Sequence, residues 1–235
     1  MPVAITSRSG VDESVHHGAV VGIDAGGALA YSLGDPDLVL YPRSANKPIQ
    51  AAAMVRLGLD LPDELLALVC ASHDGSSAHI AGVERILASV GLDASALRNT
   101  PSLPLERAAA EDVLRAHGHA SSLFMNCSGK HAGMLATCVV NGFPTDSYLS
   151  PEHPLQQRIT DEIQLRTGAM THVGIDGCGA PAHVSTLRGL ANAFRTIADE
   201  RGRVYVAMTS HPEMVGGPAR DVTVLMRHVT GCMAK

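Results

Sequence analysis

Apolar and polar positions follow a strand pattern near the start of the chain and a helical pattern through its middle. Two short runs rich in strand-forming residues, 18–24 and 28–33, flank Ala25-Gly26-Gly27, and this arrangement predicts a tight hairpin. A third strand is expected at 38–41, where it would deliver the chain to Ser44. The first part of the chain is therefore predicted to consist of strands.

Helices are expected where apolar residues recur at spacings of three and four between proline and glycine signals. They are predicted at 48–57, 62–71, 78–90, 104–117, from the loop 126–133 to residue 140, and at 154–166, 185–198 and 218–228. A short buried strand is expected at 171–175 and a new strand from Gly231, while 203–209 fits helix and strand equally. Strands, then helices, then strands favour an α/β (α+β) fold in a single domain over 1–235.

Composition and charge exclude several classes of protein. The 235 residues are 46% apolar, which is enough for a substantial core. A net charge of -5 without a basic run argues against nucleic acid or an anionic membrane as partner. The N-terminus lacks the apolar core of a secretory signal and the chain has no 18-residue apolar span, so a cytoplasmic location is expected. Five cysteines at irregular spacing suit reduced thiols or a metal site better than a disulfide framework.

The segment from Arg43 to Pro48 is the strongest candidate for chemistry. Ser44 lies three residues before Lys47, so one turn would bring the hydroxyl and the amine together. A serine needs an adjacent base, and lysine can be that base only if burial or a positive field lowers its pKa from about 10.4 toward ~7 to 8. Pro48 suits the first helical position, so Ser44 to Lys47 are expected to form the preceding turn. A serine cap with a solvated lysine is the plain alternative.

The scarcity of lysine favours the chemical interpretation. Lys47, Lys130 and Lys235 are the three lysines among 18 basic residues, and the other fifteen are arginines. Each lysine lies among small, polar or cysteine neighbours. Unlike arginine, lysine can lose its proton when it is buried. These three positions are therefore candidates for an amine that must become neutral, although a GC-rich genome could produce the same bias.

Cys127 and Cys178 are the best metal candidates, because each lies in a small-residue turn and thiolates suit zinc. No C-x-x-C pair or H-E-x-x-H motif accompanies them, so each could equally be a buried thiol that behaves as a small apolar residue. Ser72 follows an alanine-containing helix and could simply cap it. The remaining thiols lie in apolar runs and are expected in the core: Cys70, Cys138 and Cys232. Three histidines lie in the same loops as these candidates: His73, His131 and His183.

Five motifs occur in order along almost the whole chain: Arg43-Ser44-x-x-Lys47-Pro48-x-Gln50, Ala71-Ser72-His73, Asn126-Cys127-Ser128-Gly129-Lys130-His131, Gly174-x-Asp176-Gly177-Cys178-Gly179-Ala180-Pro181 and Met208-x-x-His211-Pro212-Glu213. Each motif is weak alone, but the combination strongly resembles the rhizobial-type asparaginase family, sometimes called asparaginase II or class three. The resemblance implies a serine-β-lactamase/glutaminase-like fold with a largely antiparallel sheet packed with helices. It also implies a homodimer that hydrolyses L-asparagine to L-aspartate and ammonia.

The resemblance also implies roles for individual residues. Two Ser-Lys tandems match, Ser44 with Lys47 and Ser72 with Lys235. A zinc site matches Cys127, Lys130 and Cys178, and the substrate-binding positions match Arg43, His131 and Asp176. On this basis Lys47 is expected to deprotonate Ser44, which attacks the side-chain amide while backbone N–H groups hold the oxyanion. Ser72 and Lys235 would relay protons and keep Lys47 neutral.

The chain departs from the family pattern at one position. Family sequences continue past the lysine that matches Lys235 with further strands, so the expectation is either a fragment or an impaired second tandem. Three alternative functions stay open. A penicillin-recognising enzyme would need S-D-N and K-T-G elements, which are absent. A glutaminase differs by one methylene, worth about 1 to 3 kcal/mol in a pocket. A non-catalytic zinc-binding relative would hold metal without turnover.

Overall fold

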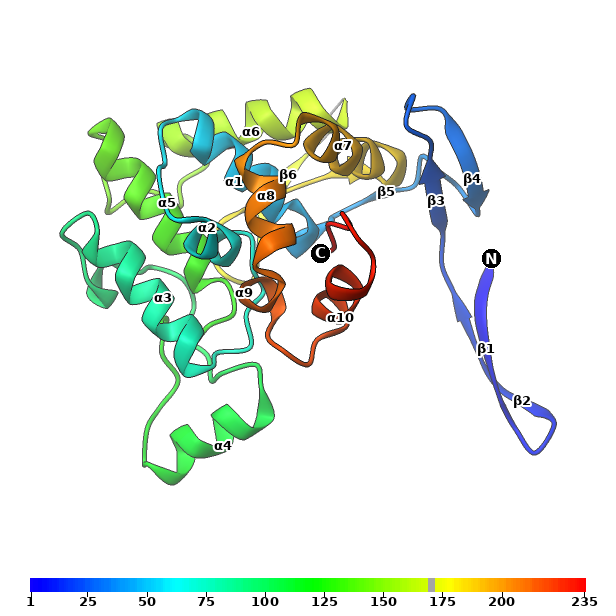
Figure 1. The fold of residues 1–235 in the computed structure, drawn as a ribbon, viewed down its shortest axis with the longest axis horizontal. Coiled ribbons are helices and arrows are strands. Elements are labelled where there is room, and N and C mark those ends of the chain that lie inside the picture. The colour runs from blue at the N-terminus through cyan, green and yellow to red at the C-terminus, as the bar shows by residue number, and fades with distance from the viewer. Residues whose placement is uncertain (169–171) are drawn as a thin grey trace.

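A computed structural model describes residues 1–168 and 172–235, and it shows a helical body with the N-terminal hairpins on one side (Figure 1). The helices are α1 (Lys47–Arg56), α2 (Asp63–Val69), α3 (Ser77–Ala88), α4 (Arg107–Arg115), α5 (Ser128–Asn141), α6 (Pro154–Thr167), α7 (Leu187–Glu200), α8 (Arg203–Ser210), α9 (Pro212–Gly216) and α10 (Asp221–His228). The strands are β1 (Pro2–Arg8), β2 (Val11–His17), β3 (Val20–Ile23), β4 (Leu29–Leu33), β5 (Val39–Leu40), β6 (Val173–Ile175), β7 (Pro181–His183) and β8 (Ser185–Thr186).

Within residues 1–168 and 172–235 the strands form four separate antiparallel pairs, β1 with β2, β3 with β4, β5 with β8 and β6 with β7. A mixed fold with antiparallel strands is therefore confirmed. The largely antiparallel sheet that the resemblance implies is represented within the described residues only by these two-stranded pairs. The predicted hairpin is β3–β4, and its turn contains Gly27 at a φ of +86°.

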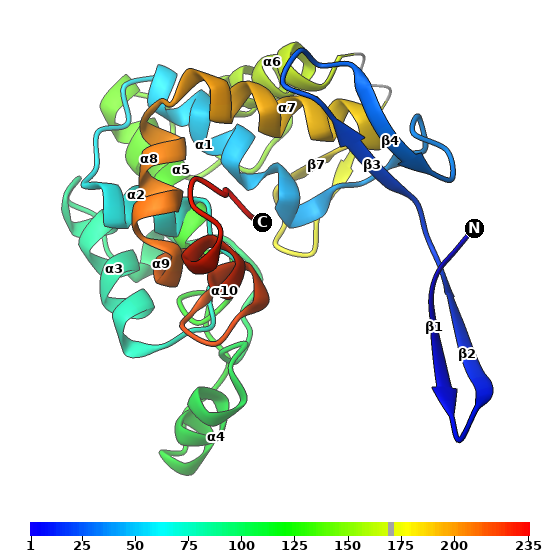
Figure 2. The same ribbon diagram turned by 45° about the vertical axis from the view of Figure 1, so that its right-hand side comes forward.

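The hairpin β1–β2 was not predicted. It projects away from the helical body in both ribbon views (Figures 1 and 2), and all of its residues are exposed. Ile5 faces Val15 across the pair, and β-branched residues are favoured in strands. The Ser9-Gly10 dipeptide, which forms the turn with both residues at positive φ, was the signal that could have identified the hairpin.

The helix predictions were largely confirmed, with ends that differ by a few residues. The segment 203–209, which fitted both states, is the helix α8. A strand from Gly231 was wrong, because the chain has turn and irregular backbone from there to Lys235. Of the strand expected at 171–175, residue 171 lies outside the described residues, and β6 is only partly buried, with Ile175 79% exposed.

The core is centred on α2, whose residues from Leu65 to Val69 are buried. The N-terminal half of α5 crosses α2 closely, because Gly129 and Gly133 lack the Cβ atoms that would clash with Leu68 and Val69. The loop before α5 is thereby brought beside the residues that follow α2. This crossing places the motif around Cys127 next to Ser72.

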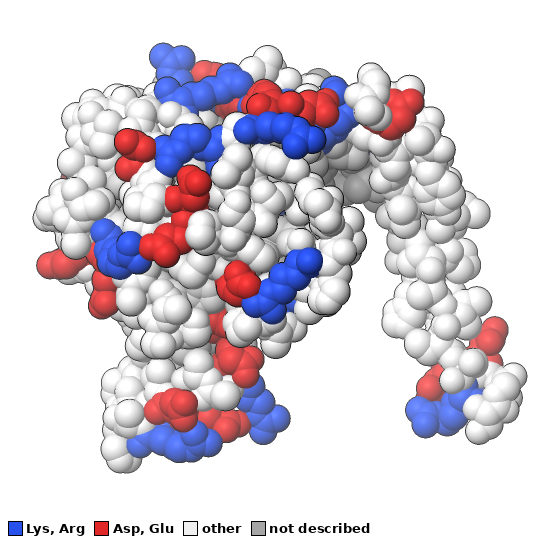
Figure 3. All heavy atoms as spheres, in the orientation of Figure 1, with Lys and Arg blue, Asp and Glu red and all other residues white. Residues whose placement is uncertain are grey.

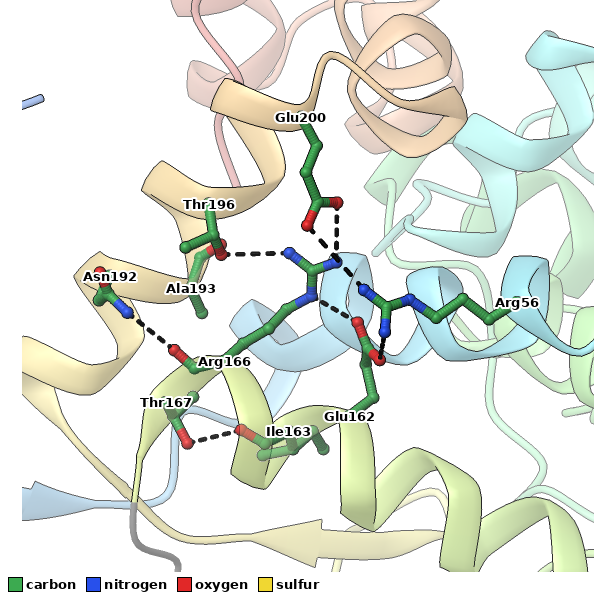
Figure 4. Close-up of polar contacts among 9 residues, drawn as sticks. All are labelled: Arg56, Glu162, Ile163, Arg166, Thr167, Asn192, Ala193, Thr196 and Glu200. Carbon is green, nitrogen blue, oxygen red and sulfur yellow. Dashed lines mark hydrogen bonds and ion pairs between the residues drawn. The ribbon is translucent and has the colours of Figure 1, made fainter.

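Acidic and basic side chains are interspersed over the face of the body shown in Figure 3. A network of ion pairs joins α1, α6 and α7 around Arg166, which is 4% exposed (Figure 4). Its guanidinium donates to Glu162, to Thr196 Oγ1 at 3.1 Å and to Glu200 Oε2 at 2.8 Å. Arg56 pairs with the other Glu162 oxygen at 3.2 Å. This network holds α1, which begins at the candidate site residue Lys47, against α6 and α7.

Replacing Glu162 with leucine is expected to lower the free energy of unfolding by about 3 to 5 kcal/mol. The variant removes the carboxylate that the buried Arg166 shares with the half-exposed Arg56. Urea denaturation measures this loss. Glu111→Leu is the matched control, since Glu111 pairs with arginines on the exposed face of α4 and should cost less than about 1 kcal/mol. Equal losses in the two variants would show that the network does not stabilise the fold.

Candidate active site

The segment Arg43–Asn46 forms a single 3₁₀ turn that leads directly into α1. The expected turn is confirmed, and the helix begins one residue earlier than predicted, at Lys47, whose N–H donates to the Ser44 carbonyl. Ser44 is half-buried, whereas Lys47 is 1% exposed. The serine therefore lies near the surface and the lysine side chain points into the protein.

The Lys47 amine contacts the residues that follow α2. Its Nζ donates to the Ala71 carbonyl and to Ser72 Oγ at 3.2 Å. Among the described residues no hydrogen bond joins Lys47 to Ser44, so the expected direct contact within the first tandem is not formed. Position 47 is in the first turn of α1, and its side chain packs toward the end of α2 rather than back along its own turn. The lysine of the first tandem is thus bonded to the serine of the second.

Burial is the largest influence on the pKa values of the Lys47 and Lys235 amines. It lowers the pKa of Lys47, assisted by the charge of Lys130 and opposed by the nearby Cys127 thiol. Burial also lowers the pKa of Lys235 well below its ordinary value, and the Lys47 charge lowers it further. Two amines that share one niche cannot both carry a proton without repulsion. The niche therefore favours a neutral lysine beside the Ser72 hydroxyl.

Two thiols and an amine lie beside this niche. Lys130, 2% exposed, donates from Nζ to Cys178 Sγ at 3.2 Å. A hydrogen bond to Cys178 lowers the pKa of Cys127, and the charges of Lys47 and Lys130 lower it further against the effect of burial. The same bond and burial raise the pKa of Cys178. The shared hydrogen bond therefore favours the thiolate form of Cys127 over that of Cys178.

The donor set of Cys127, Lys130 and Cys178 fits zinc. Tetrahedral zinc binds sulfur and nitrogen at about 2.3 and 2.0 Å, which puts two such ligands roughly 3.5 Å apart, close to the observed Nζ–Sγ contact. Two thiolates and a neutral amine would balance the charge of the ion. The described residues contain no group of three or more His, Cys, Asp or Glu side chains placed to hold a metal. A site here therefore requires the lysine as third ligand.

A small pocket of about 10 Å³, room for roughly one water molecule, opens beside the amines and is lined by Arg43, Asn46, Lys47, Gln50, Lys130, Asp176, Pro181, Ala182 and His183. Arg43 Nη2 pairs with Asp176 Oδ1 at 2.5 Å. The backbone of Arg43 has a φ of +54°, which is uncommon for a residue with a side chain. Such strain persists only where the surroundings hold it, and it is concentrated at functional sites. Arg43 is held in this conformation at the rim of the pocket.

Residues 4–235 match the sequence model of the L-asparaginase II family. The match covers nearly the whole chain and includes every loop described above. The chain belongs to the L-asparaginase II family. No curated protein sequence matches it. Membership of the asparaginase II family supports an amidohydrolase that acts on asparagine, a small molecule. Within residues 1–168 and 172–235, no helix is both long enough and apolar enough to cross a membrane.

The fold brings together most of the residues that the asparaginase II resemblance had marked. Lys47, Ser72 and the three zinc candidates meet at one place, and Arg43 and Asp176 form the rim of the pocket. The five cysteines are free, as predicted. Cys70 and Cys138 are fully buried, whereas Cys232 is half-buried against the core.

His131 occupies a different place from the one expected of a substrate-binding residue. It is 0% exposed and is not among the residues that line the pocket. Its Nδ1 shares a hydrogen bond of 2.8 Å with the Tyr148 hydroxyl. Burial lowers the pKa of His131 well below its ordinary value, followed by the charges of Lys130 and Lys47. It therefore lies behind the amines as a neutral side chain.

Two buried polar residues in the pocket were not assigned a site role from the sequence. Asn46 donates from Nδ2 to the His183 carbonyl at 3.4 Å, and its Oδ1 has no partner among the described residues. His183 shares a 2.8 Å hydrogen bond with Thr160 Oγ1, and burial lowers its pKa to about 4. In the sequence, Asn46 lies between Ser44 and Lys47, and His183 was one of the three histidines noted in the candidate loops. Their convergence depends on the contact between the 3₁₀ turn Arg43–Asn46 and β7.

Proposed function

We propose that the chain hydrolyses L-asparagine to L-aspartate and ammonia through a serine nucleophile and an acyl-enzyme. The observation that carries this proposal is the buried Lys47 amine, hydrogen-bonded to a serine hydroxyl and next to a pocket with a paired cation and anion. Family membership supports the substrate class. A buried amine of this kind suits a general base, because burial favours its uncharged form.

In the proposed mechanism Ser44 attacks the carbon of the substrate's side-chain amide. Ser72, already bonded to Lys47, relays the Ser44 proton to the amine, which replaces the direct transfer expected from the sequence. The Ser44 oxygen forms an ester as the carbon–nitrogen bond breaks, and the leaving nitrogen takes the proton from Lys47 to depart as ammonia. Water then attacks the ester, its proton returns through the same amine to Ser44, and L-aspartate is released. Lys235 is proposed to assist the proton relay through Ser72.

Arg43 and Asp176 are proposed to bind the charged end of the substrate. L-asparagine carries an α-carboxylate and an α-ammonium, and the Arg43–Asp176 pair offers the complementary charges at the rim of the pocket. His131 is proposed to support this end from behind, through Lys130, rather than by direct contact. The extra methylene of glutamine would displace either the charged end or the amide from its partner.

Zinc is proposed to bind through Cys127, Lys130 and Cys178. When bound, it would supply a positive centre that orients the polar end of the substrate. The chain's own residues carry out the proton transfers. The family also leads us to propose a serine-β-lactamase/glutaminase-like fold, a homodimer and a cytoplasmic location, the last in keeping with five free thiols.

Ammonia release from L-asparagine tests the proposed function, with Ser44→Ala as the control and L-glutamine as the competing substrate. We expect turnover of L-asparagine by the wild-type chain and none above background in the variant. Higher kcat/KM on L-glutamine would make the chain a glutaminase. Full zinc content without turnover of either amide would identify a metal-binding relative instead.

Cys178→Ser is expected to weaken zinc binding by roughly tenfold or more, since loss of even an outer-shell partner costs 10- to 100-fold. The serine oxygen is a poor substitute for a thiolate at this metal. Elemental analysis after dialysis against a chelator measures the retained zinc. Cys232→Ser is the matched control, because Cys232 is a half-buried thiol outside the candidate site. Equal zinc retention in Cys178→Ser, Cys127→Ser and the control would remove the metal assignment.

A further inference from the structure

His73 joins the loop that carries Ser72 to the loop that carries Cys127. Its ring Nε2 shares a hydrogen bond of 2.8 Å with Ser128 Oγ, and both side chains are 0% exposed. Its backbone N–H donates to the Asn126 carbonyl at 3.2 Å. His73 is therefore bonded to both residues that flank Cys127 in the sequence. The resemblance assigned no role to this histidine.

The same segment is held from the opposite side by α9. The Ser72 N–H donates to the Val215 carbonyl at 3.1 Å. His79, whose ring lies 5.3 Å from the His73 ring, contacts Asp74 Oδ1 at 2.6 Å and the Glu213 carbonyl at 3.0 Å. Residues 72–74 are thus clamped between α9 and the start of α5. A shift of either clamp would move the Ser72 hydroxyl.

The separation of the two loops affects the Lys47 amine, because this amine interacts with residues of both. Its Nζ donates to the Ala71 carbonyl and to Ser72 Oγ on one side, and the Cys127 thiol influences it from the other. The His73–Ser128 bond is the buried side-chain link between those two sides. Rigid placement of this kind is what positions catalytic groups to within a fraction of an ångström.

We propose that His73 is a positioning residue that sets the separation between the Ser72 hydroxyl and the Cys127 thiol, and so couples the proton-transfer site to the proposed zinc site. The proposal rests on the proposed function for its kinetic consequence. Its geometric consequence is independent of that function. Loss of the His73–Ser128 bond frees the Cys127 loop whether or not the chain binds zinc or hydrolyses asparagine.

The geometric part is tested in metal-free protein by the rate at which iodoacetamide alkylates Cys127, followed by peptide mass spectrometry. His73→Leu and Ser128→Ala are each expected to raise this rate about fivefold or more, since each breaks one buried hydrogen bond. The double variant should react no faster than the faster single variant, because both remove the same link. His73→Gln, which keeps a polar nitrogen near the Nε2 position, should restore much of the protection.

Two controls separate local loosening from general destabilisation. His153→Leu removes another buried histidine, at the start of α6, and should leave Cys127 alkylation at the wild-type rate. Alkylation of the fully buried Cys138 reports global opening in every variant and should not change. Unchanged Cys127 rates in His73→Leu, or rates in the double variant equal to the product of the single effects, would overturn the proposal.

The kinetic part uses L-asparagine and the zinc-loaded enzyme. His73→Leu should lower kcat about tenfold or more while KM changes less than twofold, because the amine and hydroxyl move apart but the rim of the pocket does not. A raised KM with unchanged kcat would contradict a positioning role. Protected Cys127 without turnover in the wild-type chain would refute the proposed function alone, whereas normal turnover with unaltered alkylation in the variants would refute the positioning role alone.

Discussion

Replacing Lys47 with methionine is expected to lower kcat on L-asparagine by about 10³-fold or more, within the range that general-base groups contribute. Methionine has nearly the shape of lysine and suits a site that is 1% exposed, so the fold should survive. It removes the amine that contacts Ser72 Oγ. Lys47→Arg should be equally inactive, because arginine keeps its charge and cannot accept a proton.

Steady-state ammonia release measures this loss, and circular dichroism and zinc content establish that the variants are folded and loaded. Arg85→Met is the matched control, because Arg85 pairs with Glu64 on the exposed face of α3. It should retain the wild-type rate. Turnover by Lys47→Met within tenfold of wild type would exclude Lys47 as the base.

Ser44→Ala is expected to lower kcat by about 10⁴-fold or more, because it removes the atom that forms the acyl bond. Ser72→Ala should cost less, about 10²-fold, since water can occupy the place of a relay hydroxyl. Comparison of the two kcat values decides which hydroxyl is the nucleophile. Ser72 is the one bonded to Lys47. A more severe loss in Ser72→Ala than in Ser44→Ala would therefore reverse the two roles.

Local patterns were sufficient to predict most of the helices. The helix α5 ends at Gly142, which has a φ of +66°, and α1 has proline in its first turn, so both signals could be identified along the chain. The strand expected at Gly231 failed because a strand requires a pairing partner, and a short apolar run does not specify one. The hairpin β1–β2 was missed although the Ser9-Gly10 turn signal was visible.

The sequence identified the residues of the candidate site but not which of them contact one another. Motif positions identified Lys47, Ser72 and Cys127, and the fold brings them together. The spacing of Ser44 and Lys47 suggested a local contact, yet the direction of a long side chain depends on which helix its own helix packs against. The crossing of α5 over α2, made possible by Gly129, likewise depends on tertiary packing. Pairings of this kind cannot be obtained from spacing alone.

Acid quenching of the reaction during turnover, followed by proteolysis and mass spectrometry, tests most directly whether Lys47 activates a serine that becomes acylated. The account predicts an aspartyl group on the wild-type peptide that contains Ser44, and no such group on the same peptide of Lys47→Met. Ammonia release without acylation of any serine, or acylation of Lys47→Met at the wild-type rate, would contradict it.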